Sequence, residues 1–80
     1  MTDARSNRRE VRNPVLALPA ARKLDSLSDD SRAILRVLLL EIQADARLRA
    51  DESWRRHKAP MALYWKAVGV YAGHIARLLK

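Results

Sequence analysis

The residue types best suited to chemistry gather in residues 54–66, which read WRRHKAPMALYWK. Arginine forks pair with phosphate oxygens and lysine adds a point charge, while tryptophan rings can stack on nucleobases. The pattern therefore predicts contact with an anionic or protein partner through the cations of the C-terminal third, namely Arg55, Arg56, His57, Lys58, Lys66 and Arg77.

The distribution of charge along the chain agrees with that prediction. The 80 residues carry a formal net charge of +7, and residues 54–80 contain six Lys and Arg side chains without a single Asp or Glu. A basic segment attracts anionic partners and steers them toward the protein. A solvated basic face has the same composition, so charge alone does not distinguish a binding surface from solubility.

Catalytic and metal chemistry are poorly represented in the sequence. The absence of cysteine excludes thiol nucleophiles, disulfides and thiolate metal sites, and it suits a cytoplasmic protein. The only histidines, His57 and His74, lie far apart in the sequence, and the acidic residues form solvated pairs on one helical segment. We expect no enzymatic activity, no cofactor and no bound metal. His74 is expected to be a partly buried helix residue whose ring N–H bonds a backbone carbonyl.

Two helical segments are needed to position these side chains. Ser28 precedes Asp29 and Asp30, which is the signature of a helix N-terminus. The apolar positions that follow recur every three or four residues and predict a helix over 29–57. Its packing positions are Leu35, Leu38, Leu39 and Ile42, and its face continues through Ala46, Ala50 and Trp54.

A proline separates the second helical segment from the first. Pro60 would break a continuing helix but is favoured in the first turn of a new one, so we predict a second helix over 60–79. Its apolar residues form a heptad seam, which is Met61, Trp65, Val68, Ala72, Ile75 and Leu79. Gly69 and Gly73 predict a place where another backbone approaches closely. Both tryptophans are expected to pack inside the hairpin.

These segments predict an all-α fold. The short connection makes the two helices antiparallel neighbours, so 29–57 and 60–79 form a long helical hairpin. Residues 14–80 are predicted to be one small helical domain, with a short helix from Pro19 to about Ser26 as an apolar strap. Residues 1–13 are predicted to be a disordered basic arm. A chain this short buries a small core, which favours a dimeric helical bundle.

The sequence leaves two functions open. The wide apolar faces favour a non-enzymatic protein-interaction module, a regulator or inhibitor that works as a homodimer. The acid-free C-terminal third favours a basic accessory protein that binds nucleic acid through residues 54–66. A membrane role is disfavoured, because the apolar window 61–79 is interrupted by Lys66, His74 and Arg77.

Overall fold

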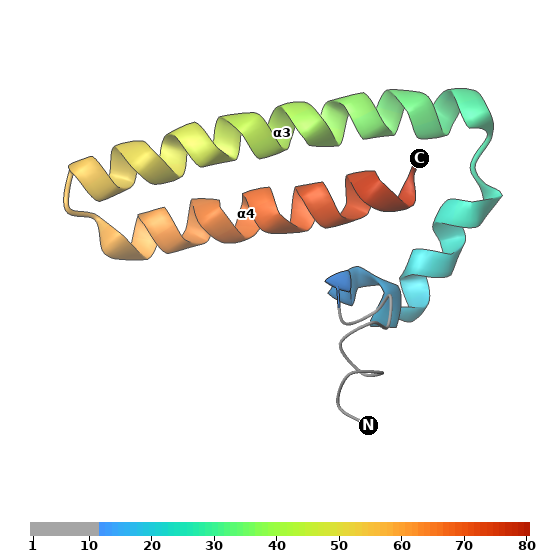
Figure 1. Cartoon of the computed structure of the whole chain (residues 1–80), viewed down its shortest axis with the longest axis horizontal. Helices are drawn as coiled ribbons and strands as arrows, with labels where there is room; N and C mark the ends of the chain where they lie inside the picture. Colours follow the sequence, from blue (N-terminus) through green and yellow to red (C-terminus); the bar gives the residue numbers. More distant parts are fainter. Residues whose placement is uncertain (1–11) are drawn as a thin grey trace.

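The structure is a computed structural model that describes residues 12–80. Two short 3₁₀ helices, η1 (Pro14–Ala17) and η2 (Pro19–Ser26), precede two long α-helices, α3 (Asp29–Arg55) and α4 (Ala59–Leu78). The long helices run antiparallel; η1 lies below the C-terminal end of α4, and η2 runs past that end up to the start of α3 (Figure 1). The predicted all-α helical hairpin is therefore confirmed, and the described residues contain no strand.

Helix α3 begins where its sequence signature places it. The Ser28 hydroxyl accepts a hydrogen bond from the Ser31 N–H at 3.2 Å, and Asp29 and Asp30 occupy the first turn. The cap satisfies one of the free N–H groups, and the two carboxylates lie at the positive end of the helix dipole. Local chemistry alone is sufficient to start this helix.

The turn after α3 is closed by a residue that the sequence did not mark. His57 adopts φ 60, in the left-handed region, and α3 ends at Arg55 instead of residue 57. The N–H of His57 bonds the carbonyl of Trp54 at 3.0 Å, and the N–H of Lys58 bonds the carbonyl of Ser53 at 2.8 Å. This pair of bonds is a Schellman motif, in which the left-handed position is usually glycine. Helix α4 then begins at Ala59, with Pro60 in its first turn.

His57→Gly is expected to stabilise the hairpin. A side chain in the left-handed region costs about 1–2 kcal/mol, and the greater backbone entropy of unfolded glycine offsets part of that gain. We expect the free energy of unfolding to rise by about 0.5–1 kcal/mol, measured by thermal unfolding followed by circular dichroism. His57→Ala is the control, because it removes the imidazole but keeps Cβ. Equal or greater stabilisation by alanine would contradict the assignment of backbone strain.

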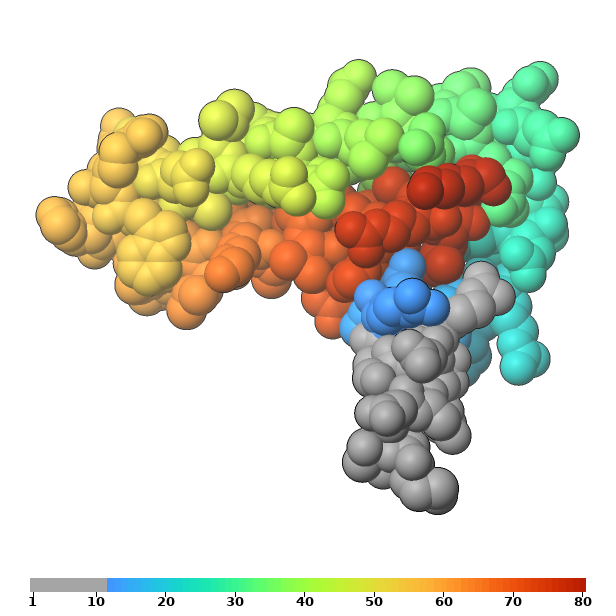
Figure 2. Space-filling view, in the orientation of Figure 1, coloured from blue at the N-terminus to red at the C-terminus, as the bar shows by residue number. Residues whose placement is uncertain are grey.

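Small residues form the contact between α3 and α4. Ala46 is 1% exposed, Ala62 0% and Ala76 1%, and a Cβ built on Gly69 would lie 3.5 Å from Cβ of Ala46. Because these side chains are short, the two helices lie against one another along α4 (Figure 2). The prediction that glycine marks a close approach of another helix agrees with this contact. No large side chain among residues 12–80 is fully buried.

Part of the seam predicted from the three- and four-residue spacing lies in the buried core, since Ala72 is 4% exposed and Leu79 3%, but other predicted positions lie outside it. Leu38 is 50% exposed, Ile42 38% and Met61 46%, and Trp54, which was expected to pack inside, is 52% exposed. The remaining seam positions are half-buried or buried: Leu35, Leu39, Trp65, Val68, Gly69, Ala72, Gly73, Ile75 and Leu79. The alanine and glycine stripe allows the closer approach of the two backbones, so the larger side chains lie beside the contact.

The N-terminal segment is joined to the hairpin by hydrogen bonds. The side chain of Asn13 is buried, accepts from the N–H of Val15 at 3.2 Å and donates to the carbonyl of His74 at 2.8 Å. Arg32 donates to the carbonyl of Leu24 at 2.6 Å and to that of Leu78 at 2.9 Å. The short helix predicted at Pro19–Ser26 is present as η2, while residues 1–11 of the predicted arm lie outside the described residues. Asn13, which the sequence assigned to the arm, is part of the folded unit.

Candidate functional site

One side of the hairpin carries five of the predicted packing residues. The guanidinium of Arg49 lies 5.0 Å from the centroid of the Trp65 ring, so the two residues share a side. Leu38 and Ile42 precede Arg49 by about three and two helical turns and lie on that side of α3. Met61 and Val68 flank Trp65 by one turn on α4. We call Leu38, Ile42, Met61, Trp65 and Val68 the apolar face.

Two of the cations predicted at the hairpin tip form ion pairs with the same carboxylate. Arg55 Nη2 lies 2.7 Å from Oε1 of Glu52, and Arg56 Nε lies 2.7 Å from Oε2 of the same residue. The hydrogen bond from Arg55, together with the charge of Arg56, lowers the pKa of Glu52 below its ordinary value. His57 and Lys58 are exposed in the turn. Part of the positive charge at the tip is therefore balanced within the protein.

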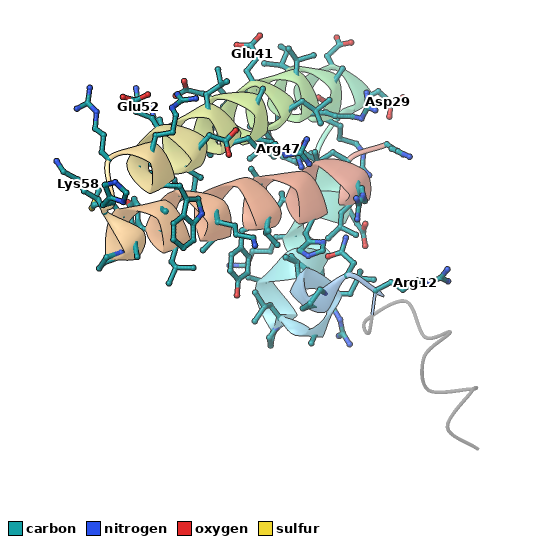
Figure 3. All side chains as sticks on the ribbon, turned by 60° about the vertical axis from the view of Figure 1, so that its left-hand side comes forward. Arg12, Asp29, Glu41, Arg47, Glu52 and Lys58 are labelled. Atoms are coloured by element: carbon teal, nitrogen blue, oxygen red, sulfur yellow. The ribbon has the colours of Figure 1, made fainter. Side chains whose placement is uncertain are left out.

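A groove of about 530 Å³ opens between the two helices on another side of the hairpin. Arg47, which lies two residues before Arg49, projects from the opposite side of α3 because two residues rotate a helix by about 200°. Figure 3 shows Arg47 at the junction of the two helices, whereas Glu41 points away from α4. We call this surface the basic groove; its polar and aromatic lining residues are Gln43, Arg47, Asp51, Trp54, Lys66, His74 and Arg77.

The basic groove continues toward the open end of the hairpin. A second hollow of about 130 Å³ shares Gln43, Arg47 and Arg77 with the first and adds Arg36 and Lys80. Asp51 is the only acid among the residues that line the two hollows. The three ion pairs formed within residues 12–80 involve Arg49, Arg55 and Arg56 and none of the groove cations. The groove is therefore more positive than the hollow beside Trp65, whose charged lining residues are Arg49, Glu52 and Arg55.

His74 lies at the groove in an arrangement that differs from the expected one. Its Nδ1 is buried and has no hydrogen-bond partner among residues 12–80, so the expected bond from this ring nitrogen to a backbone carbonyl is not formed. It is the backbone carbonyl of His74 that accepts a bond, from Asn13. His74 is half-buried and lines the groove.

The structure divides the six predicted binding residues between two separate surfaces. Lys66 and Arg77 share the basic groove, while Arg55, Arg56, His57 and Lys58 stay at the tip. Sequence reasoning missed Arg47, gave Arg36 and Lys80 no role, and included Trp54 in the nucleic-acid segment 54–66 while favouring a packed position for its ring. A signal was present, because Arg36, Arg47 and Trp54 are separated by 11 and 7 residues, both close to whole helical turns. The sequence does not show which residues of α3 lie opposite which residues of α4. The structure was therefore needed to place the Arg36, Arg47 and Trp54 stripe beside Lys66 and Arg77.

Within residues 12–80 there is no group of three or more His, Cys, Asp or Glu side chains able to hold a metal ion. Neither long helix of the described chain has the length and apolar character needed to cross a membrane. Comparison with protein-family models, with curated proteins and with solved structures found no significant match.

Proposed function

We propose that this protein is a small non-enzymatic helical interaction module that forms a homodimer through its apolar face. In that state it acts as a regulator or inhibitor by binding a partner protein, and its lack of cysteine suits the cytoplasm. The observation that carries the proposal is the exposure of Leu38, Ile42 and Met61 on one side of a hairpin whose own core is built from alanine and glycine.

The energetics of burial support self-association. Transfer of apolar surface out of water contributes about 25 cal/mol per Å². The hairpin leaves much of this contribution unused at Leu38, Ile42 and Met61, which are exposed. The heptad spacing of Met61, Trp65 and Val68 is the pattern that packs helices at a shallow angle in four-helix bundles. A second hairpin related by a two-fold axis would present the same pattern in return.

The size of the face is sufficient for a specific dimer. Helix α4 has 20 residues, which corresponds to a length of about 30 Å, and two helices side by side are about 20 Å across. A dimer would thus bury about 600 Å² per protomer, or about 1,200 Å² in total, at the lower end of the range for specific interfaces. We therefore expect an equilibrium that depends on protein concentration.

Met61→Glu tests the proposal because Met61 is 46% exposed in the single chain, so the change leaves the hairpin core intact. By symmetry it places two carboxylates in the dimer interface, and burying an unpaired charge is costly. We expect the dimer dissociation constant to rise at least about 100-fold, or about 2.7 kcal/mol. Light scattering coupled to gel filtration over a concentration series measures the effect.

Leu63→Glu is the matched control for this experiment. Leu63 is 57% exposed on the same helix, but two residues from Met61 place it on the other side of α4. The control should leave the dissociation constant within about threefold of that of the unmodified chain, or about 0.6 kcal/mol. A monomer at every concentration, or equal loss of the dimer in both variants, would contradict an interface at the apolar face.

A further inference from the structure

We propose that the basic groove binds single-stranded nucleic acid, with the phosphates along its cations and a base stacked on Trp54. This inference goes beyond dimer formation, because it concerns the side of the hairpin opposite to Arg49 and the apolar face. Both surfaces can be occupied at once, since Arg47 and Arg49 project from opposite sides of α3.

Charge is the first property of the groove that fits a polyanion. Five cations line the two continuous hollows, against the single acid Asp51, and none of the three ion pairs of residues 12–80 uses them. From Arg36 to Trp54 the stripe on α3 spans about 27 Å at a rise of about 1.5 Å per residue. That length suits about four nucleotides, the lower end of the site sizes of single-strand binding domains.

Aromatic exposure is the second property, and it distinguishes the two tryptophans. Trp65 is engaged on its own side of the hairpin, with Arg49 over its ring and Tyr64 at 5.2 Å in an edge arrangement. Trp54 is 52% exposed, lines the groove, and has no ring or cation contact within the described chain. A free indole face beside a row of cations is the combination that single-stranded nucleic acids use.

The shape of the groove favours a single strand over a duplex. Gly69 and Gly73 lie among its lining residues at the contact of the two helices, so the cations line a hollow between two helices and not a flat face. A single strand can lay its backbone along this row of cations and turn an unstacked base toward Trp54. A duplex would contact only the rims, and its bases would remain stacked within the helix.

The structure also argues against the hairpin tip as the phosphate site. Arg55 and Arg56 share the carboxylate of Glu52, so a phosphate would have to compete with an ion pair already formed. Arg47 and Arg77 have no such competitor within the described residues. The two pairs of arginines therefore allow a comparison at equal loss of charge.

Fluorescence anisotropy with a labelled oligothymidylate of about 12 nucleotides, over a series of salt concentrations, tests the inference. Arg47→Gln together with Arg77→Gln should weaken binding at least about tenfold and reduce the slope of log K against log salt by about 1.4. Arg55→Gln together with Arg56→Gln removes the same charge from the tip and should weaken binding less than about threefold. Circular dichroism verifies that both double variants remain helical.

Trp54→Leu supplies an independent readout. The oligonucleotide should quench the tryptophan emission of the unmodified chain, and this variant should lose the quenching and bind several-fold more weakly. Equal weakening by the two arginine pairs, tighter binding of a matched duplex, or no binding at low salt would overturn the inference. So would equal binding of polyglutamate or anionic vesicles, which would make the groove a general anion surface.

Discussion

Ala46→Leu is expected to cause one of the largest losses of stability available in this protein. Ala46 is 1% exposed and faces Gly69, where an added Cβ would lie in van der Waals contact with the Ala46 Cβ, at 3.5 Å. Three more carbon atoms would force α3 and α4 apart, and such overpacking costs about 1–3 kcal/mol. An 80-residue chain has a total stability of only about 4–12 kcal/mol. Thermal unfolding should therefore show a midpoint lower by about 10 °C.

The control for this prediction is Ala44→Leu, the same substitution two residues earlier on α3. Ala44 is exposed, so the larger side chain enters solvent and the midpoint should change by less than about 3 °C. If both leucine variants unfolded at the temperature of the unmodified chain, the small-residue contact would not be the core of the hairpin. Equal destabilisation by both would assign the effect to α3 itself.

Arg32→Ala is the second change with a large expected effect. The guanidinium of Arg32 joins three elements, because it lies on α3 and donates to Leu24 in η2 and to Leu78 at the end of α4. Hydrogen bonds from a charged donor contribute about 1.5–3 kcal/mol each, and these two are only part-buried. We expect a loss of about 2–4 kcal/mol, measured by urea denaturation.

Arg32→Lys separates geometry from charge in the same experiment. A lysine keeps the charge, but its single ammonium cannot reproduce a planar fork that reaches two carbonyls, so it should recover less than half of the loss. Arg36→Ala, one turn later and without a hydrogen bond in the described chain, should change stability by less than about 0.5 kcal/mol. If Arg32→Lys had the same free energy of unfolding as the unmodified chain, the two hydrogen bonds of the guanidinium would not contribute to stability.

The two long helices were predictable because their signals are local. The Ser28 cap, the first-turn acids and Pro60 each act within a few residues, and together they place the ends of α3 and α4 within two residues. The strap helix at Pro19–Ser26 was predictable for the same reason. The end of α3 was misplaced because His57 occupies a left-handed position that carries no glycine to mark it.

The packing faces were harder to predict, because they depend on the distance between the helices. Two candidate stripes run along α4, one of large apolar residues and one of alanine and glycine, and periodicity alone ranks the larger residues first. Because the two backbones approach closely, the alanine and glycine stripe is the buried one, with Ala62 and Ala76 in the core. Leu38 and Ile42 on α3 and Met61 on α4 therefore stay exposed on the apolar face. Trp65 and Val68 of the same face are half-buried within the chain.

The candidate sites depend on contacts between distant residues. Lys66 and Arg77 could be chosen from composition, but their neighbours Arg47 and Trp54 required the register of the hairpin. Arg32 and Asn13 act through hydrogen bonds to backbone carbonyls 46 and 61 residues away, for which the sequence carries no signal. Residue type thus predicted that the chain has a basic surface, and the tertiary structure was needed to locate that surface at the basic groove.

Isotope-filtered nuclear Overhauser spectroscopy on a mixture of labelled and unlabelled chains is the most direct test of the proposed dimer. Only contacts between protomers give signals in this experiment. Dimerisation through the apolar face predicts intermolecular signals that connect the methyl groups of Leu38, Ile42, Met61 and Val68 with one another and with the Trp65 ring. No intermolecular signal at a concentration where the mass is that of a dimer, or signals confined to Leu63 and other residues off this face, would contradict it.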